Sequence, residues 1–219
     1  MHIVDYIQKD LKPVPLDTPI SSVKKIFSQV QFSHLPVIDN NRLVGLISES
    51  DVLTVEEESK KLADFNYLLE SFFAKEEDDW INLLHIFARN ESNLLPLLDK
   101  NNNYIGYFDL SDVLLFFSDT PFLNEEGIVL VVEKDNTHYS FSEISQIIET
   151  NSGKLLGVMV SAKNQNNTQI TLKVKSENIN EIIQSFRRYE YHIVSKHSDD
   201  FYLEELKNRS NYLQKYLNV

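Results

Sequence analysis

The fold is decided by a segment that the chain contains twice, LPVIDNN at residues 35–41 and LPLLDKN at residues 95–101. The residues that follow also match, GLISESDVL at 45–53 against GYFDLSDVL at 106–114, so the offset grows from 60 to 61 residues across the turn. Each copy has the pattern of an apolar strand, a polar Asp/Asn turn, a second strand that contains a Gly, and a helix. The sequence therefore predicts one strand–hairpin–helix unit that occurs twice.

A helix is also expected before each copy. In the first copy Thr18 is predicted as the N-cap and Pro19 as the first helical residue. The apolar residues expected to face the core are Val23, Ile26, Phe27 and Val30 in the first helix and Trp80, Leu83, Leu84 and Phe87 in the second. Because a unit of about 60 residues buries little surface alone, the two copies are expected to pack together.

This repeat resembles a pair of CBS (cystathionine β-synthase) domains, the arrangement called a Bateman module, with copy one at residues 1–58 and copy two at residues 59–120. The resemblance implies a cleft between the copies that holds an adenine nucleotide, AMP, ADP or ATP. It also implies that the module regulates an attached or associated protein and performs no chemistry itself.

The resemblance assigns site residues to the first copy. The family's hydroxyl and acid at the start of the closing helix fall on Ser48 and Asp51, and His34 lies where the family often has a basic side chain near phosphate. Free amides at a helix start can bind an anion, and a carboxylate can accept hydrogen bonds from ribose hydroxyls. Ser48, Asp51 and His34 are therefore candidate nucleotide ligands.

The second copy departs from this pattern. Asp112 matches Asp51 and is grouped with the same cleft, but Asp109 stands at the hydroxyl position and Leu94 matches His34. A carboxylate at the helix start would repel phosphate. The sequence therefore predicts at most one competent nucleotide site.

A purely structural role explains the same residues equally well. Ser48 and Asp51 have the spacing of an N-cap that is followed by an acidic third helical residue, and such a cap needs no ligand. His34, beside a buried strand, is more typical of a partly exposed packing residue than of a phosphate contact, so it ranks below Asp51 as a candidate. Capping and ligand binding both remain open for Ser48 and Asp51, whereas capping is favoured for Asp109.

The second half of the chain has the order β-α-β-β-α-β over residues 124–198, which predicts a ferredoxin-like antiparallel sheet with both helices on one face. It is similar to ACT domains, and a CBS pair followed by an ACT-like domain resembles the acetoin-utilisation regulatory proteins of bacteria. The loop at 134–139 has no Gly for close backbone approach to an amino acid, so pairing of subunits is expected here. Residues 199–219 are predicted to form an amphipathic C-terminal helix.

Composition narrows the function. The 219 residues include no Cys and carry a formal charge of −12, which excludes disulfides and thiolate metal sites and disfavours nucleic-acid binding. No apolar run is long enough to span a membrane and the N-terminus does not resemble a leader, so a cytoplasmic protein is expected. The sequence contains no Gly-x-Ser-x-Gly, no His-Glu-x-x-His and no phosphate-binding Gly-rich loop.

The fold class predicted is thus α+β. The predicted function is non-enzymatic: a regulatory protein that senses a small ligand, forms a homodimer and acts on a protein partner. The alternative is a ligand-free homodimeric interaction scaffold, and an enzyme that uses a carboxylate pair is ranked third. No cofactor or metal is assigned beyond the possible adenine nucleotide.

Overall fold

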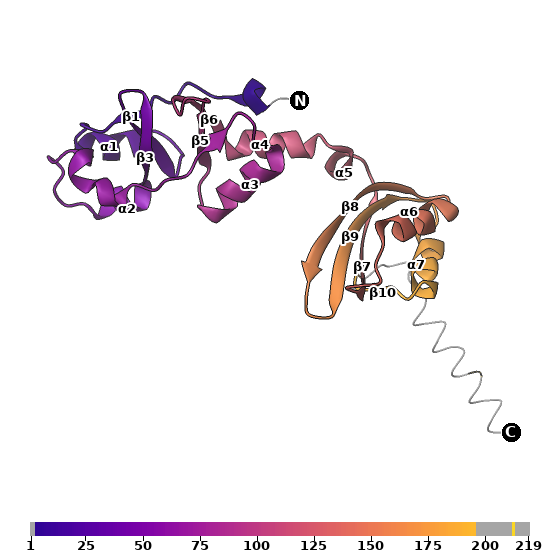
Figure 1. Ribbon diagram of the computed structural model, residues 1–219. Coiled ribbons are helices and arrows are strands. Elements are labelled where there is room, and N and C mark those ends of the chain that lie inside the picture. The colour runs from indigo at the N-terminus through magenta and orange to yellow at the C-terminus, as the bar shows by residue number, and fades with distance from the viewer. Residues whose placement is uncertain (1–2, 196–211, 213–219) are drawn as a thin grey trace. The chain divides into compact units, whose positions relative to one another are not determined.

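The computed structural model describes residues 3–195 and Tyr212, and it divides between Ser118 and Asp119 into two compact units (Figure 1). The α+β class predicted from the sequence is confirmed. None of the helices among the described residues is both long and apolar enough to cross a membrane. The helix predicted for 199–219 lies outside the described residues, apart from Tyr212.

The first unit contains the repeat. Copy one comprises η1 (Ile3–Tyr6), β1 (Val14–Pro15), α1 (Ile20–Phe27), β2 (His34–Asp39), β3 (Arg42–Ser48) and α2 (Glu49–Thr54). Copy two comprises η2 (Leu62–Leu68), β4 (Ala74–Lys75), α3 (Trp80–Arg89), β5 (Leu94–Leu98), β6 (Tyr104–Asp109) and α4 (Leu110–Ser118). Each copy has a three-stranded sheet in which the short first strand is parallel to the second strand and the third is antiparallel to it.

The registers of the two sheets repeat almost residue for residue. Val14 pairs with Val37 in one sheet and Ala74 pairs with Leu97 in the other, 60 residues later in both strands. Both hairpins also shift register at the same place, directly after Val37 and directly after Leu97. The predicted duplication of strand, hairpin and helix is confirmed.

The start of α1 differs by one residue from the sequence prediction. The helix begins at Ile20, and Pro19 is its N-cap with an extended ψ of 145°. Pro19 lies outside the helix because it is extended and pairs with Lys61 in a β-bridge, and the Ile20 amide beside it donates to the Lys60 carbonyl at 2.9 Å. The second helix begins at Trp80, where Asp79 caps it by accepting from the Asn82 amide at 2.8 Å.

The two copies are interlocked by segments that cross between them. The backbone of Gln8, ahead of β1, exchanges two hydrogen bonds with Tyr107 of copy two, at 2.9 and 3.0 Å. The backbone of Glu70, ahead of β4, exchanges two with Leu46 of copy one, both at 2.8 Å. Leu46 is fully buried and belongs to the core of copy two. Each core therefore includes residues of the other copy.

The repeated glycine of each copy makes room for the crossing segment. A Cβ at Gly45 would lie 2.8 Å from the Glu70 carbonyl oxygen, and a Cβ at Gly106 would lie 2.6 Å from the Gln8 carbonyl oxygen. Gly106 also has a φ of +148°, a conformation that side chains with a Cβ rarely adopt. The sequence indicated only that these two glycines belong to strands. The structure shows that each must lack a side chain because the backbone of the other copy passes close to it.

Asp10 also binds the segment that contains Gln8 to copy two. The Tyr107 hydroxyl donates to Asp10 Oδ1 at 2.5 Å, and this hydrogen bond lowers the pKa of Asp10 below its ordinary value of 3.8. Burial and the same bond raise the pKa of Tyr107. The carboxylate form of Asp10 is therefore the form that the folded state prefers.

The second unit has the strand order β10-β7-β9-β8 with every neighbouring pair antiparallel. Its elements are α5 (Pro121–Asn124), β7 (Ile128–Asp135), α6 (Phe141–Thr150), β8 (Lys154–Lys163), β9 (Asn167–Lys175), α7 (Ile179–Arg188) and β10 (His192–Ile193). From β7 to β10 this is the β-α-β-β-α-β order that the sequence predicted. The predicted ferredoxin-like topology is confirmed.

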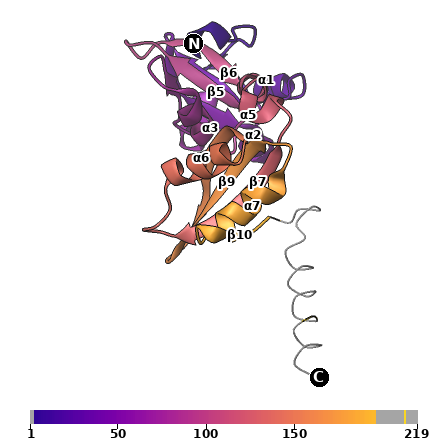
Figure 2. The same ribbon diagram turned by 90° about the vertical axis from the view of Figure 1, so that its right-hand side faces the viewer.

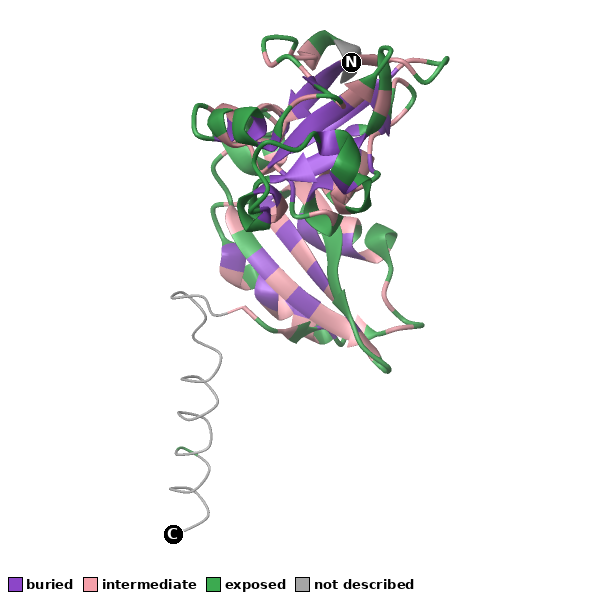
Figure 3. Cartoon of the chain, turned by 90° about the vertical axis from the view of Figure 1, so that its left-hand side faces the viewer, coloured by how far each residue is buried: buried purple, intermediate pink, exposed green. Residues whose placement is uncertain are grey.

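Both long helices of the second unit cover one face of its sheet (Figures 1 and 2). Along β9 buried residues alternate with partly exposed ones, which Figure 3 shows as alternating bands. Ile170, Leu172 and Val174 face a core that contains the buried isoleucines of both helices. The alternation in the sequence thus reported which face of the strand is buried.

We predict that Gly106→Ala lowers the stability of the first unit by about 2 kcal/mol or more, because it combines backbone strain with overpacking against Gln8. Gly45→Ala should cost less, since only overpacking applies there. Urea unfolding followed by tryptophan fluorescence measures both, because Trp80 lies in copy two. Equal stability of Gly106→Ala and the wild type would contradict the interlock.

We also predict that Asp10 makes stability depend on pH. Its pKa is lower in the folded state, so it stabilises the fold above pH 3.8, and that contribution is lost as the pH falls through the folded-state pKa. Asp10→Asn should therefore lower the thermal midpoint at pH 7, and the difference from wild type should shrink on acidification. A difference that grows toward low pH would contradict this sign.

Candidate functional site

The candidate site is a cavity of about 510 Å³ at the junction of the two copies. Copy one contributes Ser33, His34 and residues 48–51, and the chain of copy two contributes Glu70 and residues 89–91. Three of the four residues selected from the sequence, His34, Ser48 and Asp51, line this cavity together.

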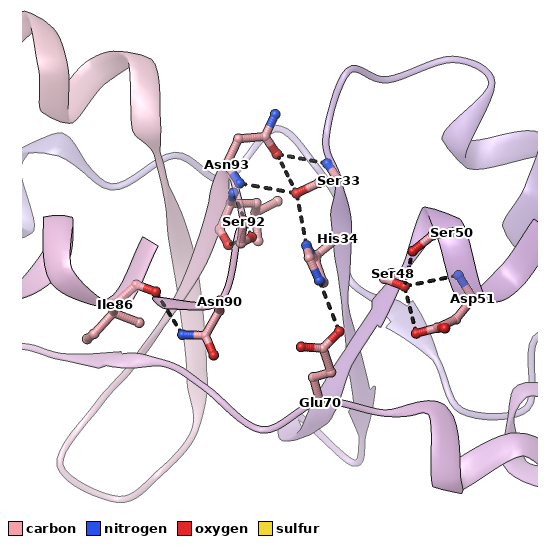
Figure 4. Close-up of polar contacts among 11 residues, drawn as sticks. Ser33, His34, Ser48, Ser50, Asp51, Glu70, Ile86, Asn90, Ser92 and Asn93 are labelled. Atoms are coloured by element: carbon pink, nitrogen blue, oxygen red, sulfur yellow. Dashed lines mark hydrogen bonds and ion pairs between the residues drawn. The ribbon is translucent and has the colours of Figure 1, made fainter. Parts of the chain in front are cut away.

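Ser48 and Asp51 form the predicted helix cap (Figure 4). The Ser48 hydroxyl accepts from the Asp51 amide at 3.1 Å and donates to Asp51 Oδ2 at 2.7 Å. The helix that they begin, α2, has only six residues, and its first amide, that of Glu49, donates to the Ser33 carbonyl at 2.9 Å. Capping is therefore confirmed at this position. A ligand role for the same two residues stays a prediction.

His34 is buried, with 5% of its surface exposed, which corrects the expectation of a partly exposed side chain. Its Nδ1 lies 2.9 Å from Ser33 Oγ, its Nε2 lies 3.2 Å from Glu70 Oε1, and the ring meets Phe72 edge-on at 5.5 Å. The crossing segment that carries Glu70 covers the ring, which the sequence of copy one could not indicate. The Glu70 carboxylate thus lies against His34, the residue that the resemblance placed near phosphate.

Ser33 and Asn93 join the two copies beside the cavity (Figure 4). Asn93 Oδ1 accepts from the Ser33 amide at 2.8 Å and from the Ser33 hydroxyl at 3.0 Å, and the Asn93 amide donates to Ser33 Oγ at 3.1 Å. Asn93 Nδ2 also donates to the Gln31 carbonyl at 2.8 Å. The two residues stand 60 positions apart, at equivalent places in the repeat. Their equivalent positions in the repeat were the signal in the sequence that could have predicted this contact.

The fourth selected residue, Asp112, does not line this cavity. It lies on α4, where its Oδ2 accepts from Gln8 Nε2 at 2.9 Å. Gln8 crosses over copy two at the position where Glu70 crosses over copy one. The cavity beside the start of α2 therefore does not include the start of α4. Asp109 caps α4 as expected, by accepting from the Ser111 amide at 2.7 Å.

A second cavity, of about 590 Å³, shares Ser33 and Glu91 with the first. Its remaining walls are mainly apolar and include Leu84, Phe87 and Leu110. The junction of the copies therefore offers an apolar compartment beside a polar one. The sequence of either copy alone does not predict this second cavity, because residues of copy two line it together with Ser33 of copy one.

The polar cavity is acidic. Its lining holds the carboxylates Glu49, Asp51, Glu70 and Glu91 against the single guanidinium of Arg89 and the imidazole of His34. Within the described part of the chain, no group of three or more His, Asp or Glu side chains is arranged to hold a metal ion. The acids therefore create a negative field without a preformed cation site.

Comparison with known proteins agrees with the repeat. The CBS domain family model matches residues 3–58. An inosine-5'-monophosphate dehydrogenase of Methanocaldococcus jannaschii is 31% identical over 111 residues, which cover 50% of this chain and 22% of that protein. The family match covers copy one, and copy two has the same strand order and register. The chain thus matches only about a fifth of the length of the dehydrogenase.

Solved structures also align with about half of the chain. A CBS domain pair/ACT domain protein from Thermotoga maritima is 21% identical, with a TM-score of 0.48 over 53% of this chain and 96% of that chain. CBSX2 in complex with AMP is 19% identical, with a TM-score of 0.46 over 53% of this chain and 95% of that chain.

We predict that Asn93→Ala loosens the contact between the two copies. Three side-chain hydrogen bonds across the junction are lost, and the Ser33 amide is left without its acceptor, so the free energy of unfolding should fall by about 1–3 kcal/mol. Asn101→Ala, in an exposed turn, is the matched control and should change it by less than about 0.5 kcal/mol. Denaturant unfolding compares the two variants, and equal effects would contradict the role of Asn93.

Proposed function

We propose that the protein is a non-enzymatic regulator that binds an adenine nucleotide, AMP, ADP or ATP, at the junction of its CBS pair. The observation that carries the proposal is the adjacency of two compartments that meet at Ser33 and Glu91. A purine needs an apolar wall, and a ribose needs hydrogen-bond acceptors and donors. The resemblance to CBS domains supplies the choice of adenine.

The polar compartment supplies groups suited to a ribose. Asp51 uses Oδ2 for the Ser48 hydroxyl, so Oδ1 can accept from a ribose hydroxyl. The Ser48 hydroxyl hydrogen can turn from Asp51 toward a ligand oxygen, because the cap bond from the Asp51 amide uses only an oxygen lone pair of Ser48. The capping and ligand roles are then compatible in one residue pair.

Regulation would follow from a shift of population. The ligand contacts residues of both copies, so it stabilises the relative orientation in which both compartments are formed. A protein partner that prefers one orientation is then controlled by ligand concentration, and the same coupling makes the partner alter ligand affinity. The second unit, which resembles an ACT domain in topology, would pair subunits in a homodimer.

We predict that Asp51→Asn weakens AMP binding about tenfold or more, since a hydrogen bond to a charged group contributes about 1.5–3 kcal/mol. Asp112→Asn is the matched control, because Asp112 holds the equivalent position in copy two but lies off the cavity. Isothermal titration of AMP, ADP and ATP against the full chain measures this. Absence of binding to the wild type at millimolar nucleotide would overturn the proposed function.

A ligand-free homodimeric scaffold is the second candidate. Large apolar side chains are exposed on the helices of the CBS pair, with Ile81 on α3 at 74% exposure and Leu115 on α4 at 63%. Such residues are typical of a surface that is covered by a second subunit.

For the scaffold we predict that Leu115→Glu, or Ile81→Glu, shifts a dimer toward monomer in light scattering after size-exclusion chromatography. Lys25→Glu, on the exposed face of α1, is the surface control. A dimer whose thermal midpoint ignores every nucleotide would favour the scaffold over the sensor.

A further inference from the structure

We infer that the polar cavity selects an adenine nucleoside with at most one phosphate and rejects free polyphosphates, with Glu91 as the specificity-determining residue. This inference rests on the proposed function and narrows its ligand class.

The first support is the balance of charge around the cavity. Four carboxylates face one guanidinium, and one of the four, Glu70, is already directed at His34 at 3.2 Å. Glu49 and Glu91 are exposed and form no ion pair with any residue that the structure describes. Arg89 is therefore the one permanent cation of the lining, and it faces a surplus of three negative charges.

The second support is that nothing among the described residues neutralises this surplus. The side chains do not form a group that could hold a metal ion within the described residues. The buried imidazole of His34 lies between Ser33 and Glu70, so it does not present a free nitrogen to the cavity. Glu49, Arg89 and Glu91 are exposed, so the effect of these charges on a ligand should depend on the salt concentration.

The ligand's own charge then decides its affinity. A nucleoside is neutral, a monophosphate carries about two negative charges at neutral pH, and each further phosphate adds about one more. Arg89 can balance part of a monophosphate, whereas the additional phosphates of ADP and ATP meet only carboxylates. Hydroxyl and base recognition are the same for all of these ligands, so the difference between them is electrostatic.

Glu91 is placed to dominate this selection because it borders both compartments. Ser33 also lines both compartments, and Glu91 is the charged residue of the two. Its backbone has a φ of 49°, in the left-handed region where Gly is favoured, so this position carries an acid where a helix end usually prefers Gly. The equivalent residue of copy one, Gln31, is uncharged.

The test is isothermal titration of the full chain with adenosine, AMP, ADP and ATP in a buffer with a chelator, at about 0.05 M and at about 0.5 M salt. We expect AMP to bind at least about fivefold more tightly than ADP, and ADP at least about fivefold more tightly than ATP. High salt should reduce these ratios. Glu91→Gln should reduce the AMP-to-ATP ratio about fivefold, while Glu77→Gln, the same charge change away from both cavities, should leave it unchanged.

The outcomes separate the two proposals. If ATP binds as tightly as AMP or more tightly in the chelator buffer, the charge selection is overturned while the nucleotide-binding function stands. If Glu91→Gln and Glu77→Gln change the ratio equally, Glu91 is not the determinant. If no nucleoside or nucleotide binds, both proposals are overturned.

Discussion

The first unit depends on one close contact, in which the backbone of each copy of the repeat approaches a glycine of the other. Gly45 meets the segment at Glu70, and Gly106 meets the segment at Gln8. A side chain at either glycine would displace a backbone carbonyl. The contact therefore requires a residue without a Cβ as well as the backbone hydrogen bonds beside it. The exchange makes the two copies a single folding unit, since Leu46 of copy one completes the core of copy two.

The same exchange creates the functional asymmetry of the pair. In copy one the crossing segment presents Glu70 to His34, and the cavity beside Ser48 and Asp51 remains open. In copy two the crossing segment presents Gln8 to Asp112 and occupies the corresponding acid. Two units with the same sequence pattern thus acquire different surroundings, because the segment at Glu70 crosses one and the segment at Gln8 crosses the other. The acidic lining then adds a constraint on charge that neither unit carries alone.

Much of this could be predicted from local patterns. The repeated LPxxD segments and the glycine steps predicted the paired hairpins, and the β-α-β-β-α-β order predicted the topology of the second sheet. Of the two interpretations left open for Ser48, capping is confirmed, and an N-cap depends on residues only three positions apart. The start of α1 was wrong by one residue, since Pro19 is extended and pairs with Lys61 of the other copy. His34 was expected to be partly exposed for the same reason: the residue that covers it lies 36 positions away.

The amino-acid sequence by itself determined the elements, their duplication and the cap at Ser48, because each of these depends on neighbours within about one turn or one hairpin. Tertiary structure alone decided which acids gather at the cavity, that Asp112 is separated from Asp51, and that Ser33 meets Asn93. Those outcomes depend on how one copy's chain crosses the other. A crossing is fixed by packing between residues far apart in the chain, and no local pattern records it.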